Sequence, residues 1–321
     1  MSAARPSASS GNPGPPARRR PRLRHWVEYF AYRTLVGILR AVPEALALRA
    51  GEVVGWLAGV VFRIRWATVM EHLRLAFPDR EPAWHRSIAR ASYRHLGRES
   101  VATFRLSRLD VAGIRERMEM VGFEAFDEAV AEGTGVVMLT GHFGNWEMAA
   151  ASVVARGGPM DVIVQRQRNP LFDADITENR ERLGMVLVER RVALKRCLRT
   201  LRNGGIVGIA GDQNIRRGGV FVDFFGRPAA TAKGAALFAL RTGATLFAGT
   251  AKRLPGFPQR YRVGVRRIEI EPTGDLEEDV LRLTKAHTAY LEGQVREAPE
   301  QYFWHHRRWK TQPTEEVEAA R

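Results

Sequence analysis

A histidine and a glutamate stand five positions apart in the stretch TGHFGNWE, residues 140–147. The preceding run GVVML is typical of a buried strand, so the stretch is expected to begin where a strand ends. Its two glycines permit a tight turn, and Asn145 suits the N-cap of a following helix. Glu147 would then lie in the first helical turn, where its carboxylate can point back toward His142.

This pair could perform general acid–base chemistry. A carboxylate bonded to one ring nitrogen fixes the tautomer of a histidine and raises the basicity of the other nitrogen. His142 could then take a proton from a hydroxyl group, with Glu147 as the orienting group. The alternative is a capping histidine that only satisfies backbone groups. Neither a G-x-S-x-G elbow nor an H-E-x-x-H motif is present, so the sequence favours neither a covalent acyl-enzyme nor zinc, and predicts no metal and no cofactor.

Two further polar loops follow apolar runs, QRQRNP at 165–170 and GDQN at 211–214. In an open α/β sheet, functional residues gather at the carboxyl ends of the strands. We therefore expect these two loops and the 140–147 stretch to form one site.

Five residues of these loops are candidate substrate or oxyanion contacts. The guanidinium groups of Arg166 and Arg168, with Asn169 beside them, suit a phosphate or an oxyanion, although an exposed basic loop would have the same composition. Asp212 and Gln213 end the third strand, where an aspartate could instead cap the next segment.

A cluster of aromatic residues could line a groove for an apolar substrate. The segment FVDFFGRPAAT carries Phe221, Phe224 and Phe225 and leads into a predicted helix at Ala229. Clustered aromatic residues also form cores, so both interpretations stay open.

The elements that must position these loops alternate between strands and helices. Strands are predicted at Gly135–Leu139, Asp161–Val164, Ile206–Ala210, Thr245–Thr250 and Arg260–Ile270. Helices are predicted at Trp146–Arg156, Phe172–Leu183, Ala193–Asn203, Ala229–Thr242 and Leu276–Glu297. This alternation predicts an α/β fold with a mostly parallel central sheet flanked by helices.

The composition divides the chain into four parts. Residues 1–22 are rich in Pro, Ser, Gly and Arg and predict a disordered basic tail. Residues 23–110 predict a helical membrane-associated region, 111–312 the α/β domain, and 313–321 a flexible C-terminal tail. The longest uninterrupted apolar run of the helical region, Val53–Phe62, falls short of the roughly 20 residues of a spanning helix. We expect amphipathic helices in a membrane interface; a hairpin packed on the main domain is the alternative.

The charge points to acidic partners. Fifty Lys and Arg against 35 Asp and Glu give a net charge of +15 and a pI near 10.9. No motif of a nucleic-acid-binding module accompanies this charge, so nucleic acid is not expected. Cys197 is the only cysteine, which excludes an internal disulfide.

GHFGNWE resembles the H-x(4)-D/E block of the glycerolipid acyltransferase superfamily, in the form found in lipid A biosynthesis (lauroyl/myristoyl-type) acyltransferases. Further blocks are similar in the same order, from about Arg65 to Lys310: EHLRLAFPDR, QRQRNPLFD, GIAGDQN, GGVFVDFFGRPAAT and PEQYFWHHRRWK. The chain departs from this pattern at His72, where such proteins usually carry asparagine.

The resemblance implies transfer of a fatty acyl chain from acyl carrier protein to a hydroxyl of a lipid A precursor, at the cytoplasmic face of the inner membrane. His142 would be the general base and Glu147 its orienting carboxylate. The implied partners are an acyl carrier protein thioester, a phosphorylated glycolipid acceptor and the anionic surface of the inner membrane. HHRRWK near the C-terminus is expected to form a basic surface rather than a metal-binding pair.

Two alternatives remain open. The chain could acylate another lipid, such as a phosphatidylinositol mannoside or a lysophospholipid, or use acyl-coenzyme A as donor. It could also be a non-catalytic lipid-binding protein that keeps the fold.

Overall fold

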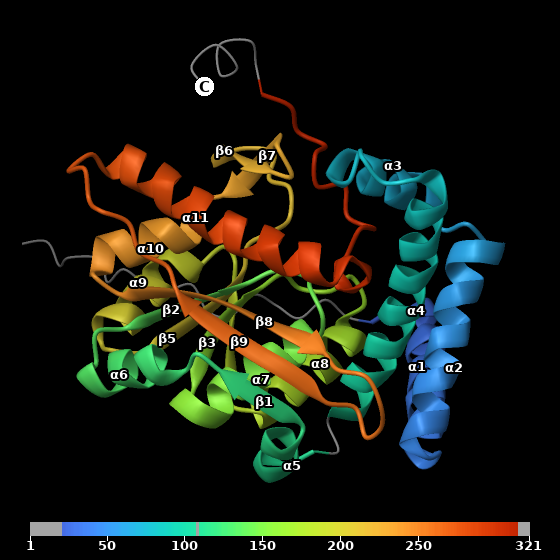
Figure 1. Cartoon of the computed structure of the whole chain (residues 1–321). Helices are drawn as coiled ribbons and strands as arrows, with labels where there is room; N and C mark the ends of the chain where they lie inside the picture. The colour runs from blue at the N-terminus through green and yellow to red at the C-terminus, as the bar shows by residue number, and fades with distance from the viewer. Residues whose placement is uncertain (1–20, 107–108, 314–321) are drawn as a thin grey trace, which may run out of the picture.

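A seven-stranded sheet forms the centre of the molecule in the computed structural model, which describes residues 21–106 and 109–313 (Figure 1). Its strand order is β1-β9-β8-β2-β5-β3-β4. Every neighbouring pair is parallel except β8 and β9. The predicted α/β fold with a mostly parallel sheet is therefore confirmed. The strands are β1 (Met118–Val121), β2 (Val136–Thr140), β3 (Met160–Val164), β4 (Met185–Glu189), β5 (Ile206–Ala210), β8 (Thr245–Arg253) and β9 (Tyr261–Arg267).

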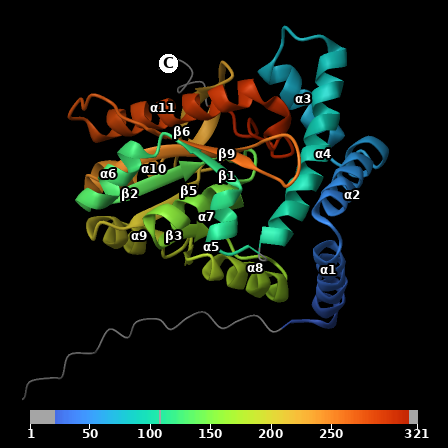
Figure 2. The same cartoon turned by 60° about the horizontal axis from the view of Figure 1, so that its bottom comes forward.

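Helices cover both faces of this sheet, and strands such as β2 are therefore buried on both sides. One face carries α5 (Val111–Glu116), α6 (Glu124–Glu132) and α7 (Trp146–Gly157). The other carries α9 (Ala193–Arg202), α10 (Gly234–Thr242) and α11 (Leu276–Glu297). Figure 2 shows α7 and α11 on opposite sides of the strands. Next to the edge strand β4 lies α8 (Pro170–Arg182).

The structure adds strands that the sequence analysis did not predict. The helix expected from Ala229 begins only at Gly234, because β7 (Arg227–Ala232) pairs with β6 (Gly219–Phe224) in an antiparallel hairpin. Gly226 and Phe225, both with positive φ, form its turn. Also unpredicted were β1, which has only four residues, and β4 at the edge of the sheet.

Four α-helices and a π-helical turn make up the described N-terminal region: α1 (Leu23–Ala41), α2 (Glu44–Trp56), η1 (Leu57–Val61), α3 (Trp66–Ala76) and α4 (Pro82–Leu106). Glycines let α2 approach α4 closely: a Cβ at Gly55 would overlap the carbonyl of Tyr93, and one at Gly97 would overlap the carbonyl of Gly51. This region is thus helical, while its predicted association with a membrane stays a prediction.

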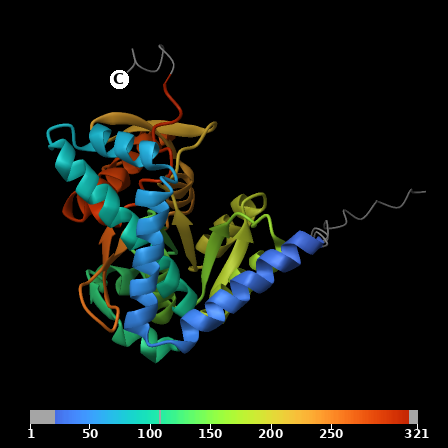
Figure 3. The same ribbon diagram turned by 90° about the vertical axis from the view of Figure 1, so that its right-hand side faces the viewer.

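Helix α1 points away from α2 and packs against α8 (Figure 3). The Tyr32 hydroxyl donates to Asp175 Oδ2 at 2.9 Å, and Arg33 forms an ion pair with the same carboxylate. No single helix in the described ranges has the length and apolarity to cross a bilayer. The segments Glu44–Val61 and Trp66–Ala76, bent by 90°, pass that test only as a pair. The predicted tails 1–22 and 313–321 lie, apart from residues 21, 22 and 313, outside the described residues.

Candidate active site

The carboxyl ends of β2, β5 and β3 meet at one edge of the sheet, because these three strands are neighbours. Thr140 at the end of β2 is in register with Ala210 at the end of β5. The loops that follow β2 and β5 carry His142, Asp212 and Gln213. The structure brings these three residues together, as predicted.

Asp212 holds His142 at two atoms. The ring Nδ1 lies 2.6 Å from Asp212 Oδ1, and the backbone N–H of His142 donates to Oδ2 at 2.9 Å. Because a carboxylate only accepts hydrogen bonds, Nδ1 carries a proton and Nε2 presents a lone pair. That lone pair faces the side-chain amide of Gln213, and the distance between His142 Nε2 and Gln213 Nε2 is 3.3 Å. The geometry is that of a base with a fixed tautomer.

The charges of the pair support each other. Burial by itself lowers the pKa of His142, but the charge and the hydrogen bond of Asp212, together with the charge of Glu147, outweigh it and raise this pKa above 6.5. Burial alone would raise the pKa of Asp212; the contacts with His142 and the charge of Arg308 hold it below its usual value. Asp212 is therefore an anion that stabilises a positive charge on the ring.

Glu147 has a different partner from the one expected. It forms a two-point ion pair with Arg180 of α8, in which Nε donates to Oε2 at 3.0 Å and Nη2 contacts Oε1. This corrects the prediction that Glu147 orients His142, because Asp212 reaches Nδ1 from the neighbouring strand and the first turn of α7 aims Glu147 at α8. Glu147 still lies in the same cavity as His142 and raises its pKa through space.

The loop around His142 is held through its backbone. The carbonyl of His142 accepts from Phe303 N at 3.0 Å. The N–H groups of residues 142–145 all donate within the protein, so none of these four groups is available to an oxyanion. Their acceptors are Asp212 Oδ2, Gly141 O, Gln301 O and Ala251 O.

A cavity of about 320 Å³ opens beside His142, between the sheet and α7. Its mouth is polar and its interior is apolar. The polar residues, which are exposed or half-buried, are Thr140, His142, Glu147, Gln165, Gln167, Arg180 and Gln213. The apolar ones include the buried Met138, Val153, Met160, Met185, Val263 and Val265. Such a lining suits an alkyl chain with a reactive polar end next to the histidine.

A second, open hollow of about 710 Å³ adjoins this cavity, since Gln165 and Gln167 line both. It contains the three predicted residues Arg166, Arg168 and Asn169, together with aromatic side chains of α1, α4 and α8. These three residues therefore lie next to the cavity of His142 rather than within its lining.

Two of the three have partners in the protein. Arg166 forms ion pairs with Asp173 at 3.0 Å and Glu189 at 2.6 Å. Asn169 caps α8, and its amide donates to Glu28 of α1 at 3.0 Å. Arg168 is exposed at the rim of the hollow.

The aromatic cluster lies elsewhere. Phe224 and Phe225 are buried in a core cluster with Tyr93 and Trp304, and Phe221 is half-buried on β6. In the described part of the chain none of these phenylalanines lines the His142 cavity. The predicted acyl groove at these positions is corrected, because the β6–β7 hairpin carries them to α11 instead of α7.

The C-terminal HHRRWK segment is only partly the predicted basic surface, because Arg307 and Lys310 are exposed and the rest is buried or half-buried. His305 and Arg308 lie in the core, and Arg308 donates to the Ala230 carbonyl at 2.8 Å. Across residues 21–106 and 109–313, no three His, Cys, Asp or Glu side chains are placed to hold a metal ion. The sequence analysis missed that residues 301–303 support the loop of His142; the density of aromatic residues there was the available signal.

Comparison with known proteins gives a family match over most of the chain. The family described as bacterial lipid A biosynthesis acyltransferase matches residues 17–311. A lipid A biosynthesis acyltransferase of Haemophilus influenzae is 31% identical over 196 residues, 60% of this chain and 58% of that protein. A phosphatidylinositol mannoside acyltransferase of Mycobacterium tuberculosis is 31% identical over 162 residues, 49% of this chain and 51% of that protein. A lipid A biosynthesis lauroyltransferase of Escherichia coli is 27% identical over 293 residues, 90% of this chain and 93% of that protein. The chain thus aligns with little more than half the length of the first two relatives and with nearly all of the third.

Proposed function

We propose, from the premise that this chain belongs to the bacterial lipid A biosynthesis acyltransferase family, that it transfers a fatty acyl chain from acyl carrier protein to a hydroxyl group of a lipid A precursor. One observation carries the proposal: the His142–Asp212 pair presents the unprotonated Nε2, which faces only the amide of Gln213 among the described contacts, at the polar mouth of an apolar cavity. The cavity accommodates the acyl chain, and the thioester carbonyl of the donor lies near Nε2 of His142.

The reaction needs no covalent enzyme intermediate. Nε2 of His142 takes the proton of the acceptor hydroxyl while that oxygen attacks the thioester carbonyl. The C–O bond forms, the C–S bond breaks, and the leaving thiolate takes the proton from the imidazolium. Asp212 keeps the Nδ1 proton in its hydrogen bond throughout and stabilises the imidazolium. Proton transfer of this kind contributes about 10²–10⁴-fold in rate.

Arg180 supplies hydrogen bonds to the oxyanion of the tetrahedral intermediate. It lies at the mouth of the cavity, where the ion pair with Glu147 fixes its guanidinium. Two contacts with Glu147 leave other N–H groups of the fork for the substrate. Glu147 is then a positioning residue for Arg180, and its charge also favours protonation of His142.

The lipid acceptor approaches through the second hollow, where Arg166 and Arg168 face the phosphates of its headgroup. We place the protein at the cytoplasmic face of the inner membrane. The support is an exposed apolar surface on the N-terminal helices together with the net charge of +15. The exposed side chains are Leu23, Trp26, Val27, Phe30, Leu35, Ile38, Leu46, Val53, Val54, Val61, Phe62 and Ile64.

A second candidate is acylation of a phosphatidylinositol mannoside, or of another lipid such as a lysophospholipid. The relative from Mycobacterium tuberculosis, named for the mannoside, matches at the same 31% identity as the lipid A relative from Haemophilus influenzae. Acyl-coenzyme A as donor belongs to the same chemistry, because it carries the same thioester.

The test offers the purified protein labelled acyl carrier protein thioesters of graded chain length, with a tetraacylated lipid A precursor as acceptor. Parallel reactions contain the mannoside, a lysophospholipid or acyl-coenzyme A. We expect transfer to the lipid A precursor that is lost in His142→Ala and kept in His85→Gln, a buried histidine of α4 bonded to the Phe77 carbonyl. Turnover on the other lipids alone would discard the lipid A assignment. No transfer in any reaction would leave a lipid-binding protein.

A further inference from the structure

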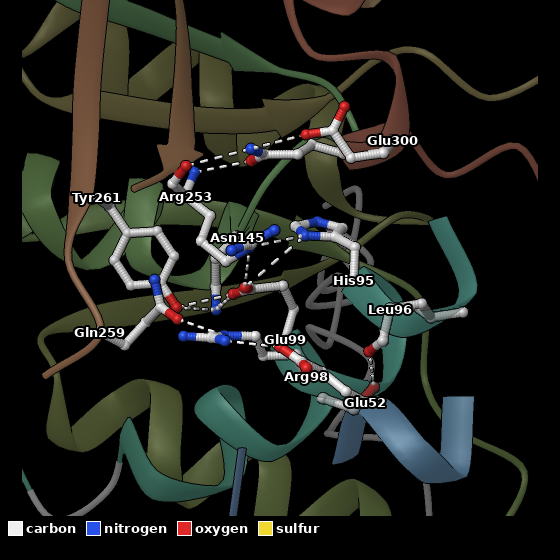
Figure 4. A network of polar contacts seen from close by, with 12 residues as sticks. Glu52, His95, Leu96, Arg98, Glu99, Asn145, Arg253, Gln259, Tyr261 and Glu300 are labelled. Carbon is white, nitrogen blue, oxygen red and sulfur yellow. Dashed lines mark hydrogen bonds and ion pairs between the residues drawn. The ribbon is translucent and has the colours of Figure 1, made fainter. Parts of the chain in front are cut away.

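A network of polar contacts joins α4 to Asn145, which follows His142 by three residues (Figure 4). At its centre is Glu99 of α4, of which only 4% is exposed. Its Oε2 accepts hydrogen bonds from Asn145 Nδ2 at 2.9 Å and from the Tyr261 hydroxyl at 2.7 Å. One carboxylate of the N-terminal helical region thus contacts both the start of α7 and strand β9.

The position of Asn145 explains why an acceptor is needed there. Its Oδ1 caps α7 by accepting from Met148 N at 3.0 Å. With the oxygen committed to the cap, the NH₂ group of the same amide points away from the helix. Only 2% of Asn145 is exposed, so this group depends on protein acceptors, and Glu99 gives the shortest of its hydrogen bonds.

The carboxylate also reaches the second support of the loop. Oε1 of Glu99 lies 3.6 Å from Nε of Arg253. The backbone of Arg253 exchanges two hydrogen bonds with the side chain of Gln301, at 2.7 and 3.1 Å. The carbonyl of Gln301 in turn accepts from Gly144 N at 2.9 Å. Glu99 therefore connects to residues 144 and 145 along two routes.

Packing alone does not account for a carboxylate at this position. A buried charge costs several kcal/mol unless partners compensate it, and an apolar side chain of similar size often packs as stably. Burial raises the pKa of Glu99 despite its hydrogen bonds with Tyr261 and Asn145. What a carboxylate provides here is a directed acceptor under the helix cap.

We propose that Glu99 is a positioning residue of the active site, which fixes Asn145 and thereby the loop that carries His142. The N-terminal helical region then supports the active-site loop through Glu99, in addition to its proposed contact with the membrane. The kinetic part of this inference rests on the proposed acyl transfer; the structural part does not.

The test compares three variants of the full chain. Glu99→Leu removes the acceptor, and Glu99→Gln keeps an oxygen for Asn145 and Tyr261. Arg98→Met is the matched control, because Arg98 is the adjacent buried charge on α4, yet its hydrogen bonds go to Glu52, Gln259 and the Gly256 carbonyl. Hydrogen–deuterium exchange of the segment 141–150 and steady-state kinetics are measured for each.

We expect Glu99→Leu to lower kcat by about 10- to 100-fold with KM within about twofold, since small displacements of a catalytic group have effects of this size. Exchange in 141–150 should become faster at the same time. Glu99→Gln should retain kcat within about threefold, and Arg98→Met should lose thermal stability without a change in either readout. Unchanged exchange in Glu99→Leu, or equal effects in Arg98→Met, would overturn the proposal. A wild-type protein without acyl transfer would contradict the proposed function, while the exchange data would still decide the role of Glu99.

Discussion

Two carboxylates, those of Asp212 and Glu147, lie near His142, and they differ in how they contact its ring. Asp212 provides both a charge and the hydrogen bond to Nδ1, whereas Glu147 acts on the ring through its charge alone. The two residues should therefore differ in how strongly they affect the ring.

Replacing Asp212 with Asn should lower the rate of acyl transfer by about 10²–10⁴-fold, because an amide can stabilise the wrong tautomer and does not stabilise the imidazolium. It should also lower the pKa of His142 further than Glu147→Gln does. The measurement is an NMR titration of the His142 ring alongside steady-state kinetics. A larger pKa change in Glu147→Gln would return the orienting role to Glu147.

The pH dependence of the reaction follows from the direction of the His142 shift. A general base acts in its neutral form, so the rate rises as pH increases through its pKa. That pKa is raised above 6.5 in the folded protein, which places the midpoint of the rising limb above 6.5. In Asp212→Asn the raising effect is removed and burial lowers the pKa, so the limb should move to lower pH. Profiles of kcat/KM against pH for both proteins test this; a limb that stays in place would exclude His142 as the titrating group.

At the scale of elements, the close approach of α2 and α4 depends on glycine. A side chain at Gly55 would meet the backbone of Tyr93 and Gly97. Gly55→Val should therefore destabilise the protein by about 1–3 kcal/mol, the usual cost of overpacking. Gly37→Ala is the control, because a Cβ at Gly37 in α1 meets no atom within 4 Å, and it should be neutral or stabilising by up to about 1 kcal/mol. Denaturant unfolding of both variants measures the difference, and equal stabilities would show that the helices separate without cost.

The sequence predicted those elements whose apolar pattern is long and clear. The core strands β2, β3 and β5 and their polar loops were found because parallel strands buried on both faces leave continuous apolar runs. The strands β1 and β4 and the β6–β7 hairpin were missed. They are about as long as the core strands, but each is only partly buried, so none has the fully buried pattern of β2.

For the site, the residue types were predictable but their pairing was not. His142, Asp212 and Gln213 were identified from strand ends. Which carboxylate meets the ring depends on β5 lying beside β2, and strand order does not follow from periodicity. Glu99 was not identified at all, since a single glutamate on a helix gives no signal of a contact with Asn145, 46 positions away.

At the scale of the whole molecule, the positive charge and the exposed apolar side chains would both favour the proposed contact with an anionic membrane. Helices α1 and α2, which carry most of the exposed apolar side chains of the N-terminal region, lie toward the viewer in Figure 3. Attraction of basic groups to anionic lipid is screened by salt, while burial of apolar side chains is not. Binding to vesicles should accordingly weaken with salt but persist when the exposed apolar surface is intact.

Phe30 of α1, 62% exposed, is the sharpest probe of that surface. Burying such a side chain contributes about 1.5–3 kcal/mol, so Phe30→Asp should weaken binding to vesicles that contain anionic lipid by about 10- to 100-fold. Leu276→Asp at the start of α11 is the matched control, because it changes the net charge equally and removes a side chain that is 42% exposed outside the N-terminal helices. Sedimentation with vesicles at low and high salt gives both affinities. Phe30→Asp should lose the salt-resistant part of binding, and Leu276→Asp should keep it. Equal losses in the two variants would mean that charge alone attracts the protein to lipid, and the amphipathic contact of α1 would have to be abandoned.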